Sequence, residues 1–283
     1  MTTPDSLTTP DGTRIAYRDD GPRPAYRDDG PRPTPGDRGP ILLLHGLAGH
    51  MDEWAALRQL LLADGHRVVS YDARGHGAST RRPADMSRRA AVADAEALVM
   101  HLGTSPMTLL GQSLGGLTAL QLAASRPDLV SHLILIEAGP ACRNPALPEQ
   151  IATWLNTWPA TGFPTREDAE SFLGHEAWAA GLTQGEDGHW HPRFDARKMV
   201  EAVRELATED YWQDWSRITC PTLVLRGEKG TMPPEEVHKM QSPRPGTRVE
   251  VISGAGHDVH LDQPGAVYAA LAAFLRTSEG VET

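Results

Sequence analysis

The residue whose setting is best suited to chemistry is Ser113, in a Gly-x-Ser-x-Gly sequence at residues 111–115. An apolar run from Met107 to Leu110 precedes it, and a run rich in Ala and Leu follows it. This order predicts a strand, a tight turn and a helix, and the small residues at 111, 115 and 116 permit a turn that side chains would obstruct. Such a turn raises the serine hydroxyl above the sheet and points the first N–H groups of the helix at the same place.

Strands and helices are expected to alternate on both sides of this segment. Apolar runs predict buried strands at residues 41–44, 68–72, 131–136, 221–227 and 248–252, and helices are expected near residues 52–61, 86–102 and 263–276. A turn and an edge strand are expected at Asp11 to Tyr17, followed by a Pro-rich loop from Pro22 to Pro40. The alternation predicts an α/β fold with a mostly parallel, doubly wound sheet.

A nine-residue sequence occurs twice in succession near the N-terminus. Residues 16–24 recur unchanged at 25–33, and there is no third copy. Two short, Pro-rich copies do not make a solenoid. We interpret the second copy as a local duplication that lengthens a surface connection.

The alternation stops between Gly139 and Arg217, where six of the seven tryptophans lie. The segment is too long for an ordinary connection, and its Gly and Pro residues indicate short helices and loops. We therefore expect an inserted, mainly helical cap at 139–217, with the α/β core formed by 1–138 and 218–283. So much aromatic surface is typical of an apolar substrate pocket, whose walls we expect to include Trp154, Trp158, Trp178 and Trp212.

Composition excludes several other classes of protein. The chain has 27 Lys and Arg and 37 Asp and Glu, which give a net charge of −10 and argue against nucleic-acid binding. No apolar run approaches the ~18–20 residues of a membrane span, and the N-terminus has no apolar signal-peptide core. The only two cysteines, Cys142 and Cys220, indicate free thiols in a reducing cytoplasm. We recognise no metal or cofactor motif and expect neither.

Four segments, in this order and spacing, resemble the α/β-hydrolase superfamily, in particular its capped, single-domain bacterial members. The resemblance runs from about Asp11 to Leu275, apart from the cap and the duplicated loop. The four segments are His45-Gly46-Leu47, Asp72-x-Arg74-Gly75-His76-Gly77-x-Ser79, Gly111-x-Ser113-x-Gly115 and Gly254-x-Gly256-His257.

The resemblance implies that Ser113 is a nucleophile and that His257 is its general base. A serine hydroxyl is a poor nucleophile at neutral pH, so a positioned imidazole must take its proton. The resemblance also implies an oxyanion hole formed by the backbone N–H groups of Leu47 and Leu114.

Among the twelve histidines, His257 is favoured by its place in a Gly-rich turn after the last strand. We expect His260 to pack or hydrogen-bond behind the site. The remaining competitors are His45 and His76, which we expect to shape loops, and His50.

The acid of the expected triad departs from the usual pattern. Similar enzymes place an aspartate three residues after the strand that ends at Gly227, but this chain has Gly230 there. An acid is still needed to orient the imidazole. We expect Glu137, at the end of the strand after the nucleophile helix, a placement resembling that in zearalenone lactonases and some haloalkane dehalogenases. The alternatives are Glu228 and Asp258, or a Glu137 that only anchors the hinge of the cap.

A serine in the turn, in place of an aspartate, favours acyl transfer over dehalogenase or epoxide hydrolase chemistry. We therefore expect an enzyme that hydrolyses a small-molecule ester or lactone with an apolar body, through an acyl-enzyme on Ser113. One alternative is C–C bond hydrolysis of a diketone-like compound by the same triad. Another is a catalytically silent ligand-binding protein, for which the missing aspartate at 230 would be a sign of decay.

Overall fold

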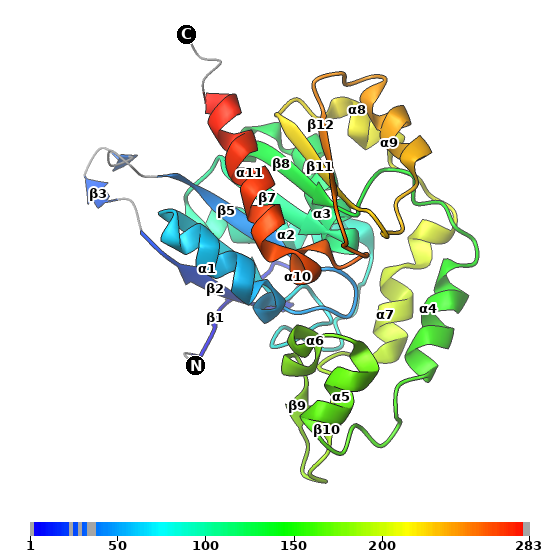
Figure 1. The fold of residues 1–283 in the computed structure, drawn as a ribbon. Coiled ribbons are helices and arrows are strands. Elements are labelled where there is room, and N and C mark those ends of the chain that lie inside the picture. Colours follow the sequence, from blue (N-terminus) through cyan, green and yellow to red (C-terminus); the bar gives the residue numbers. More distant parts are fainter. Residues whose placement is uncertain (1–2, 23–24, 28–29, 33–37, 280–283) are drawn as a thin grey trace.

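Figure 1 shows a computed structural model of the chain, which describes residues 3–22, 25–27, 30–32 and 38–279. Within these residues, the centre is an eight-stranded sheet of order β1-β2-β6-β5-β7-β8-β11-β12. Strands β6, β5, β7, β8, β11 and β12 run parallel, and β2 is antiparallel to both β1 and β6. The strands are β1 (Asp5–Thr8), β2 (Arg14–Asp20), β5 (Arg38–Leu44), β6 (His66–Tyr71), β7 (Met107–Gln112), β8 (Val130–Ile136), β11 (Thr222–Gly227) and β12 (Arg248–Ile252).

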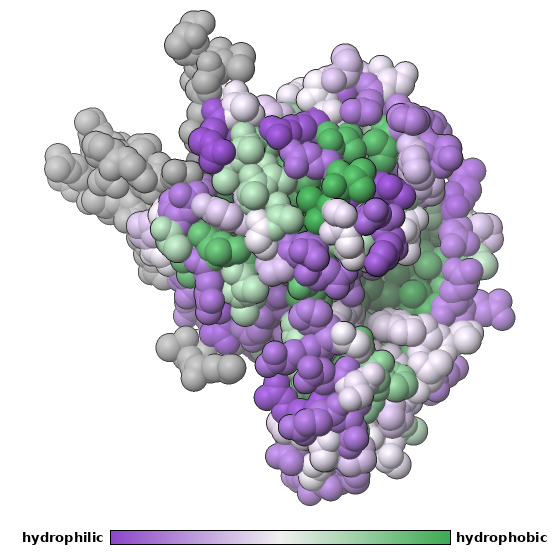
Figure 2. Space-filling model, viewed as in Figure 1, coloured by the Kyte–Doolittle hydropathy of each residue, from purple (hydrophilic) through white to green (hydrophobic). Residues whose placement is uncertain are grey.

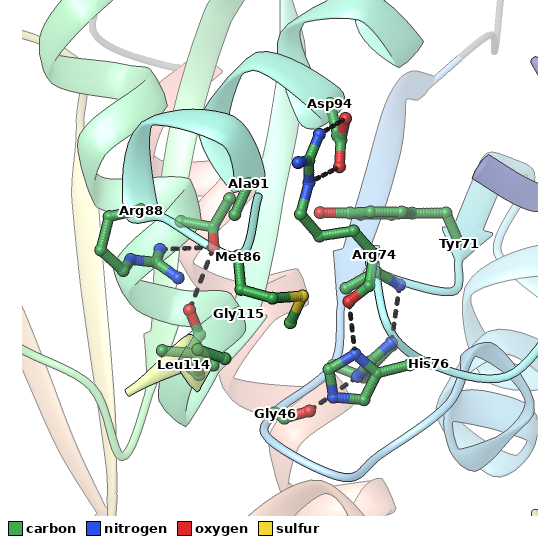
Figure 3. Close-up of a pocket in the computed structure, with 14 residues that line it drawn as sticks. Gly46, Tyr71, Arg74, His76, Met86, Arg88, Ala91, Asp94, Leu114 and Gly115 are labelled. Atoms are coloured by element: carbon green, nitrogen blue, oxygen red, sulfur yellow. Dashed lines mark hydrogen bonds and ion pairs between the residues drawn. The ribbon is translucent and has the colours of Figure 1, made fainter. Parts of the chain in front are cut away.

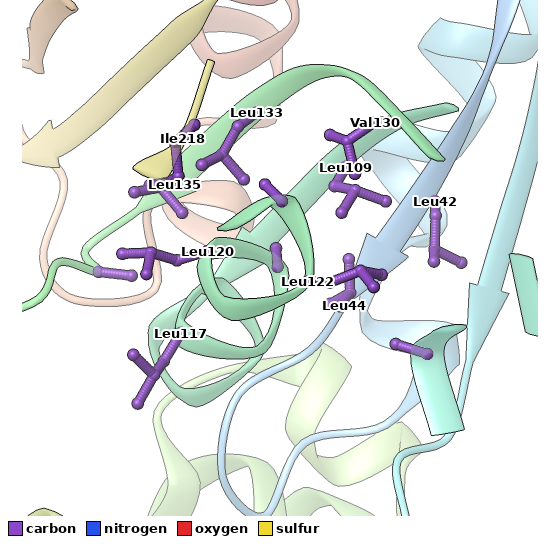
Figure 4. Packing of buried hydrophobic residues seen from close by; sticks show 14 of the residues in the cluster. Leu42, Leu44, Leu109, Leu117, Leu120, Leu122, Val130, Leu133, Leu135 and Ile218 are labelled. Atoms are coloured by element: carbon purple, nitrogen blue, oxygen red, sulfur yellow. The ribbon is translucent and has the colours of Figure 1, made fainter. Parts of the chain in front are cut away.

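Helices cover both faces of this sheet, because successive residues of a strand point to opposite sides. Ile41 and Leu43 of β5 pack in the cluster that contains residues of α1 and α11. Leu42 and Leu44 pack in the opposite cluster with residues of α2 and α3 (Figure 4). Each fully buried aliphatic side chain contributes roughly 1.5–3 kcal/mol. The core helices are α1 (Ala55–Ala63), α2 (Arg88–Leu102), α3 (Ser113–Ser125), α10 (Val259–Asp262) and α11 (Pro264–Glu279), with a 3₁₀ turn η1 (Met51–Trp54) before α1 and η2 (Pro127–Leu129) before β8.

Helices on both faces of a mostly parallel sheet confirm the predicted α/β, doubly wound fold. Within the described ranges, no helix combines the length and the apolar composition that crossing a membrane requires.

The segment between β8 and β11 is built from short helices and a two-stranded ribbon. Its helices α4 and α7 lie side by side in Figure 1, and α5 and α6 pack together below them. Phe194 and Met199 of this segment pack with Ala48 and Met86 of the core loops, so the segment is joined to the core by apolar contact. Its elements are α4 (Leu147–Asn156), α5 (Arg166–Leu173), α6 (Glu176–Ala180), β9 (Thr183–Gln184), β10 (Trp190–His191), α7 (Ala196–Ala202), η3 (Arg204–Ala207) and α8 (Trp212–Arg217); α9 (Pro234–Gln241) follows β11.

Two sequence predictions for the N-terminal region are wrong. The expected edge strand is internal, because β1 pairs along the outer side of β2 with Asp5 opposite Tyr17. The stretch from Pro22 to Pro40, predicted as loop, contains a hairpin of β3 (Ala25–Arg27) and β4 (Gly30–Arg32) and the start of β5. Pro40 is tolerated because the pairing of β5 with β6 is irregular between Arg38 and Ile41. Residues 23–24, 28–29 and 33–37 of this stretch lie outside the described residues.

The two copies of the repeated nine residues have different structures. In the first copy, residues 16–20 belong to β2, which lies between β1 and β6 and buries Ala16 and Tyr17. In the second copy, residues 25–27, which repeat 16–18, form β3, which pairs only with β4 in a separate ribbon seen at the left of Figure 1, away from α4 to α7. Neighbouring strands, which only the first copy has on both sides, account for the difference.

Deleting residues 25–33 should leave the free energy of unfolding within ~0.5 kcal/mol of the wild-type value, because the β3–β4 ribbon pairs with no strand of the main sheet. Since the copies are identical, the deleted chain still contains the whole of β2. Urea unfolding followed by tryptophan fluorescence would measure the change. A loss of more than ~2 kcal/mol would show that the ribbon contributes to the packed core.

Candidate active site

Ser113 lies at the junction of β7 and α3 in a strained backbone conformation. Its φ is 50°, a left-handed value that is uncommon outside glycine. A Cβ on Gly115 would come within 2.3 Å of the Leu44 and His45 carbonyls, and one on Gly111 would meet Gly115 at 2.6 Å. The small residues are therefore required for the helix to begin directly against the strands, which leaves the partly exposed serine at the end of the sheet.

The loop after β5 lies against the same turn. A Cβ on Gly46 would approach Oε1 of Gln112 to 2.1 Å and Cβ of Ser113 to 3.4 Å, so this loop packs directly on the nucleophile turn. Leu47 follows in the loop, and Leu114 is the second residue of α3. In the part of the chain that the structure describes, neither of their N–H groups donates a hydrogen bond to another protein group. Both are available to an acceptor in the cavity above Ser113.

Two buried histidines hold the surrounding loops. Nδ1 of His45 donates to the Gly46 carbonyl (2.7 Å), and its Nε2 accepts the N–H of Ala73 (2.9 Å). Nδ1 of His76 donates to the Arg74 carbonyl at 2.8 Å (Figure 3). Its Nε2 accepts the N–H of Ala48 at 3.1 Å. Burial lowers the pKa of both imidazoles, that of His76 to about 3. Both rings are therefore neutral, and each connects two segments of backbone, as expected from the sequence.

His257 is connected to Glu137 mainly through a third residue, Thr231. Oγ1 of Thr231 lies 3.0 Å from Nδ1 of His257 and donates to Oε2 of Glu137 at 3.2 Å. The direct distance from Nδ1 to Oε2 is 3.6 Å, which is within ion-pair range but longer than a good hydrogen bond. A hydroxyl has one hydrogen, so Thr231 must accept from Nδ1–H, which leaves Nε2 of His257 as the basic nitrogen.

Glu137 is held in place by backbone donors. Its carboxylate accepts the N–H groups of Gly227 (2.8 Å), Thr231 (2.6 Å) and Met232 (3.0 Å). Its φ of 48° is a further left-handed value at this end of the sheet, beside those of Ala48 (62°) and Ser113. Burial opposes ionisation, but the imidazole of His257 and these N–H groups outweigh it, so the pKa of Glu137 lies below its ordinary value. The carboxylate is therefore ionised at neutral pH.

Gly230 explains why the acid of the proposed triad can come from position 137. A Cβ built on Gly230 would lie 2.1 Å from Oε1 of Glu137 and 2.3 Å from its Cδ. A side chain at 230 and a glutamate at 137 thus exclude each other. An aspartate at 230 would therefore collide with Glu137, the residue that follows β8.

The rival acids contact other groups. Glu228 is on the surface, where it accepts the N–H of Gly254 (2.7 Å) and the hydroxyl of Ser253 (3.1 Å). Asp258 accepts from Gln112 and from Trp178, although it follows His257 directly. Thr231 was missed by sequence reasoning, and its position next to the anomalous Gly230 was the only available signal.

A cavity of about 210 Å³ brings the nucleophile and the histidine together with part of the inserted segment. In Figure 2, hydrophobic surface is visible in the recess between the core and helices α4 and α7. The described residues that line the cavity are Gly46, Leu47, Gly49, Glu53, Gln112, Ser113, Trp154, Trp178, His257 and Asp258.

Two of the four tryptophans expected in the pocket wall do not line this cavity. Trp158 packs against Phe163, Phe172 and Phe194 inside the inserted segment and borders a neighbouring cavity. Trp212, on α8, has the ammonium of Lys239 4.0 Å from its ring centre. It is not among the described residues that line the cavity, because α8 packs against α3 of the core before β11 begins.

His260 and Glu53 form a buried pair beside the cavity. Nε2 of His260 lies 3.2 Å from Oε1 of Glu53, whose Oε2 accepts the N–H of His50 (3.1 Å). Burial raises the pKa of Glu53, but the contact with His260 and the nearby histidines outweigh this effect and bring it to about 2. Among the described residues, no group of three His, Cys, Asp or Glu side chains is arranged to hold a metal ion.

Comparison with known proteins places this site in a family. The alpha/beta hydrolase family matches residues 41–271, which include Ser113, Glu137 and His257. The chain therefore belongs to the alpha/beta hydrolase family.

Two similar proteins are a lipase and an esterase. The sn-1-specific diacylglycerol lipase ABHD11 of Mus musculus is 29% identical over 251 residues, covering 83% of this chain and 80% of the relative. Esterase YbfF of Escherichia coli (strain K12) is 27% identical over 242 residues, covering 83% and 92%.

Solved structures share the fold along nearly the whole chain. E-2-(acetamidomethylene)succinate hydrolase matches with a TM-score of 0.81 at 22% identity, covering 96% of this chain and 99% of that one. A thermophilic esterase from Thermogutta terrifontis matches with a TM-score of 0.72 at 25% identity, covering 98% and 99%. The solved structures show the shared fold, and the family match together with the lipase and the esterase supports a hydrolase.

Gly230→Ala should destabilise the fold by about 1–3 kcal/mol, because its Cβ would overlap the Glu137 carboxylate. In a Glu137→Ala background, this loss of stability should largely disappear. A double-mutant cycle, with the free energy of unfolding measured in urea, would give the coupling energy between the two positions. Gly246→Ala is the matched control, since no atom lies within 4 Å of a Cβ there. Equal penalties at 230 in both backgrounds would contradict the proposed exclusion.

Proposed function

We propose that this hydrolase cleaves a carboxylic ester or lactone with an apolar body, using Ser113, His257 and Glu137 as its triad. The observation that carries the proposal is the connected arrangement of Glu137, Thr231 and His257 at the cavity that also contains Ser113. The two free cysteines support a location in the reducing cytoplasm.

In the first half of the reaction, Oγ of Ser113 attacks the carbonyl carbon and its proton passes to Nε2 of His257. The carbonyl oxygen becomes an oxyanion, which accepts hydrogen bonds from the N–H groups of Leu47 and Leu114. One such donor is typically worth ~2.7–4 kcal/mol in the transition state. The C–O bond then breaks, and His257 returns the proton to the leaving alcohol.

In the second half, water attacks the acyl-enzyme and gives a proton to His257, which passes it to Oγ of Ser113 as the acid is released. In each half the imidazole becomes cationic. The ionised Glu137 carboxylate stabilises that cation, and Thr231 keeps Nδ1–H directed toward the acid. This is why the acid needs a low pKa and a fixed position.

Trp154 and Trp178 supply the apolar wall of the cavity, which supports a substrate with an apolar body. We therefore assign the inserted segment, residues 139–217, the role of a cap over the site. The placement of the acid resembles that in zearalenone lactonases, which supports a lactone as one form of the substrate.

C–C bond hydrolysis would use the same residues, so turnover is the discriminating measurement. We expect hydrolysis of p-nitrophenyl esters of short fatty acids, and stoichiometric labelling by a fluorophosphonate that disappears in Ser113→Ala. Consumption of a diketone-like chromophore without any ester turnover would instead favour the C–C hydrolase. Absence of both turnover and labelling would indicate a silent binding protein.

Glu137→Gln should lower kcat for ester hydrolysis by about 10²- to 10⁴-fold, because an amide does not stabilise the imidazolium. Glu228→Gln is the matched control on the neighbouring loop, and its kcat should stay close to the wild-type value. Circular dichroism would show that both variants are folded. A larger effect at 228 than at 137 would make our assignment of the acid wrong.

A further inference from the structure

The ionisable side chains around the proposed catalytic pair carry negative charge. The lining of the 210 Å³ cavity contains the carboxylates of Glu53 and Asp258, and its described residues include neither lysine nor arginine. Arg193 borders the adjoining cavity, where its Nε donates to the Gly181 carbonyl at 2.6 Å. Glu53 is paired with His260, so a negatively charged substrate group in the catalytic cavity would meet the unpaired carboxylate of Asp258 and no lysine or arginine.

The carboxylate of Asp258 is contacted by neutral donors. Its Oδ1 accepts from the amide of Gln112 (3.3 Å), and its Oδ2 accepts from the indole of Trp178 (3.2 Å). No ion pair to Asp258 occurs in the described part of the chain. Neutral donors hold a carboxylate in place without cancelling its long-range field.

Asp258 lines the same cavity as Ser113 and His257. It follows His257 in the chain, and Gln112, which also donates to the His257 carbonyl (3.2 Å), precedes Ser113. Trp178 belongs to α6 of the inserted segment, so the same carboxylate also connects the proposed cap to the histidine loop.

We propose that this pocket selects esters without a negative charge near the scissile bond, and that the Asp258 carboxylate enforces this selection. The inference rests on the proposed ester hydrolase function and specifies its substrate class as neutral, apolar acyl compounds. Recognition of a substrate carboxylate ordinarily requires an arginine or lysine partner, which the cavity lining lacks. Repulsion between like charges at close range in a partly buried site changes affinity by one to two orders of magnitude.

The test compares two esters of equal chain length, p-nitrophenyl pentanoate and mono-p-nitrophenyl glutarate, which differ by a terminal carboxylate. With the full-length enzyme, we expect kcat/KM for the neutral ester to exceed that for the anionic ester by about 10- to 100-fold at low salt. Increasing the ionic strength should narrow this ratio by raising only the rate for the glutarate, because salt screens the repulsion.

Asp258→Asn should reduce the ratio of the two kcat/KM values about 5- to 10-fold, because kcat/KM for the glutarate ester rises. Asp258→Asn also removes one of the hydrogen bonds that Gln112 and Trp178 donate to the side chain. Trp178→Phe is the matched control for this loss. It removes the indole donor and keeps the charge, and its ratio should remain that of the wild-type enzyme whatever its absolute rates.

Equal kcat/KM values for the two esters in the wild-type enzyme would overturn this inference and leave the proposed ester hydrolase intact. A ratio that changes as much in Trp178→Phe as in Asp258→Asn would also overturn it, because loosening of the proposed cap would then be the cause. Failure to hydrolyse either ester, together with no phosphonate labelling, would overturn the proposed function itself and this inference with it.

Discussion

The carboxylate of Glu137 is the interaction on which the arrangement of this site depends. Glu137 directly follows β8, is buried, and accepts three backbone N–H groups from β11 and the turn that follows it. These bonds connect two neighbouring strands at the edge where Ser113 and His257 lie. Because a buried carboxylate without donors would be costly, the turn from Gly227 to Met232 must take the course that supplies them. That course brings Thr231 between the carboxylate and the imidazole.

Steric exclusion makes this arrangement specific. Gly230 leaves room for the glutamate, and the glutamate leaves no room for a Cβ at 230. The same kind of close contact occurs at the other side of the site, where Gly46, Gly111 and Gly115 allow β5, β7 and α3 to meet around Ser113. Strained backbone at Ser113 and Glu137 costs of order 1–3 kcal/mol each and is supported by the packed sheet beneath. Ser113 and Glu137 directly follow the adjacent strands β7 and β8, which hold their side chains in fixed positions.

The ionisable residues around the site have distinct roles. His45 and His76 are kept neutral by burial and serve as connectors between loops. Glu137, behind the imidazole, and Glu53, in the cavity wall, both have lowered pKa values because neighbouring groups stabilise their carboxylates. In the proposed mechanism Glu137 stabilises the imidazolium that forms during turnover, and in our proposal Asp258 disfavours an anionic substrate.

The sequence by itself determined the α/β fold and the places of Ser113, His257 and Glu137 relative to the strands. These follow from local patterns, namely apolar runs, glycine spacing and a missing aspartate, that need no knowledge of distant contacts. Tertiary structure decided which tryptophans face the cavity, because Trp154 and Trp212 are equally aromatic and only the paths of α4 and α8 separate them. It also decided the role of Thr231 and the two structures of the repeated nine residues. In each of these cases the outcome depends on neighbours far away in the chain, and identical residues have different partners in different places.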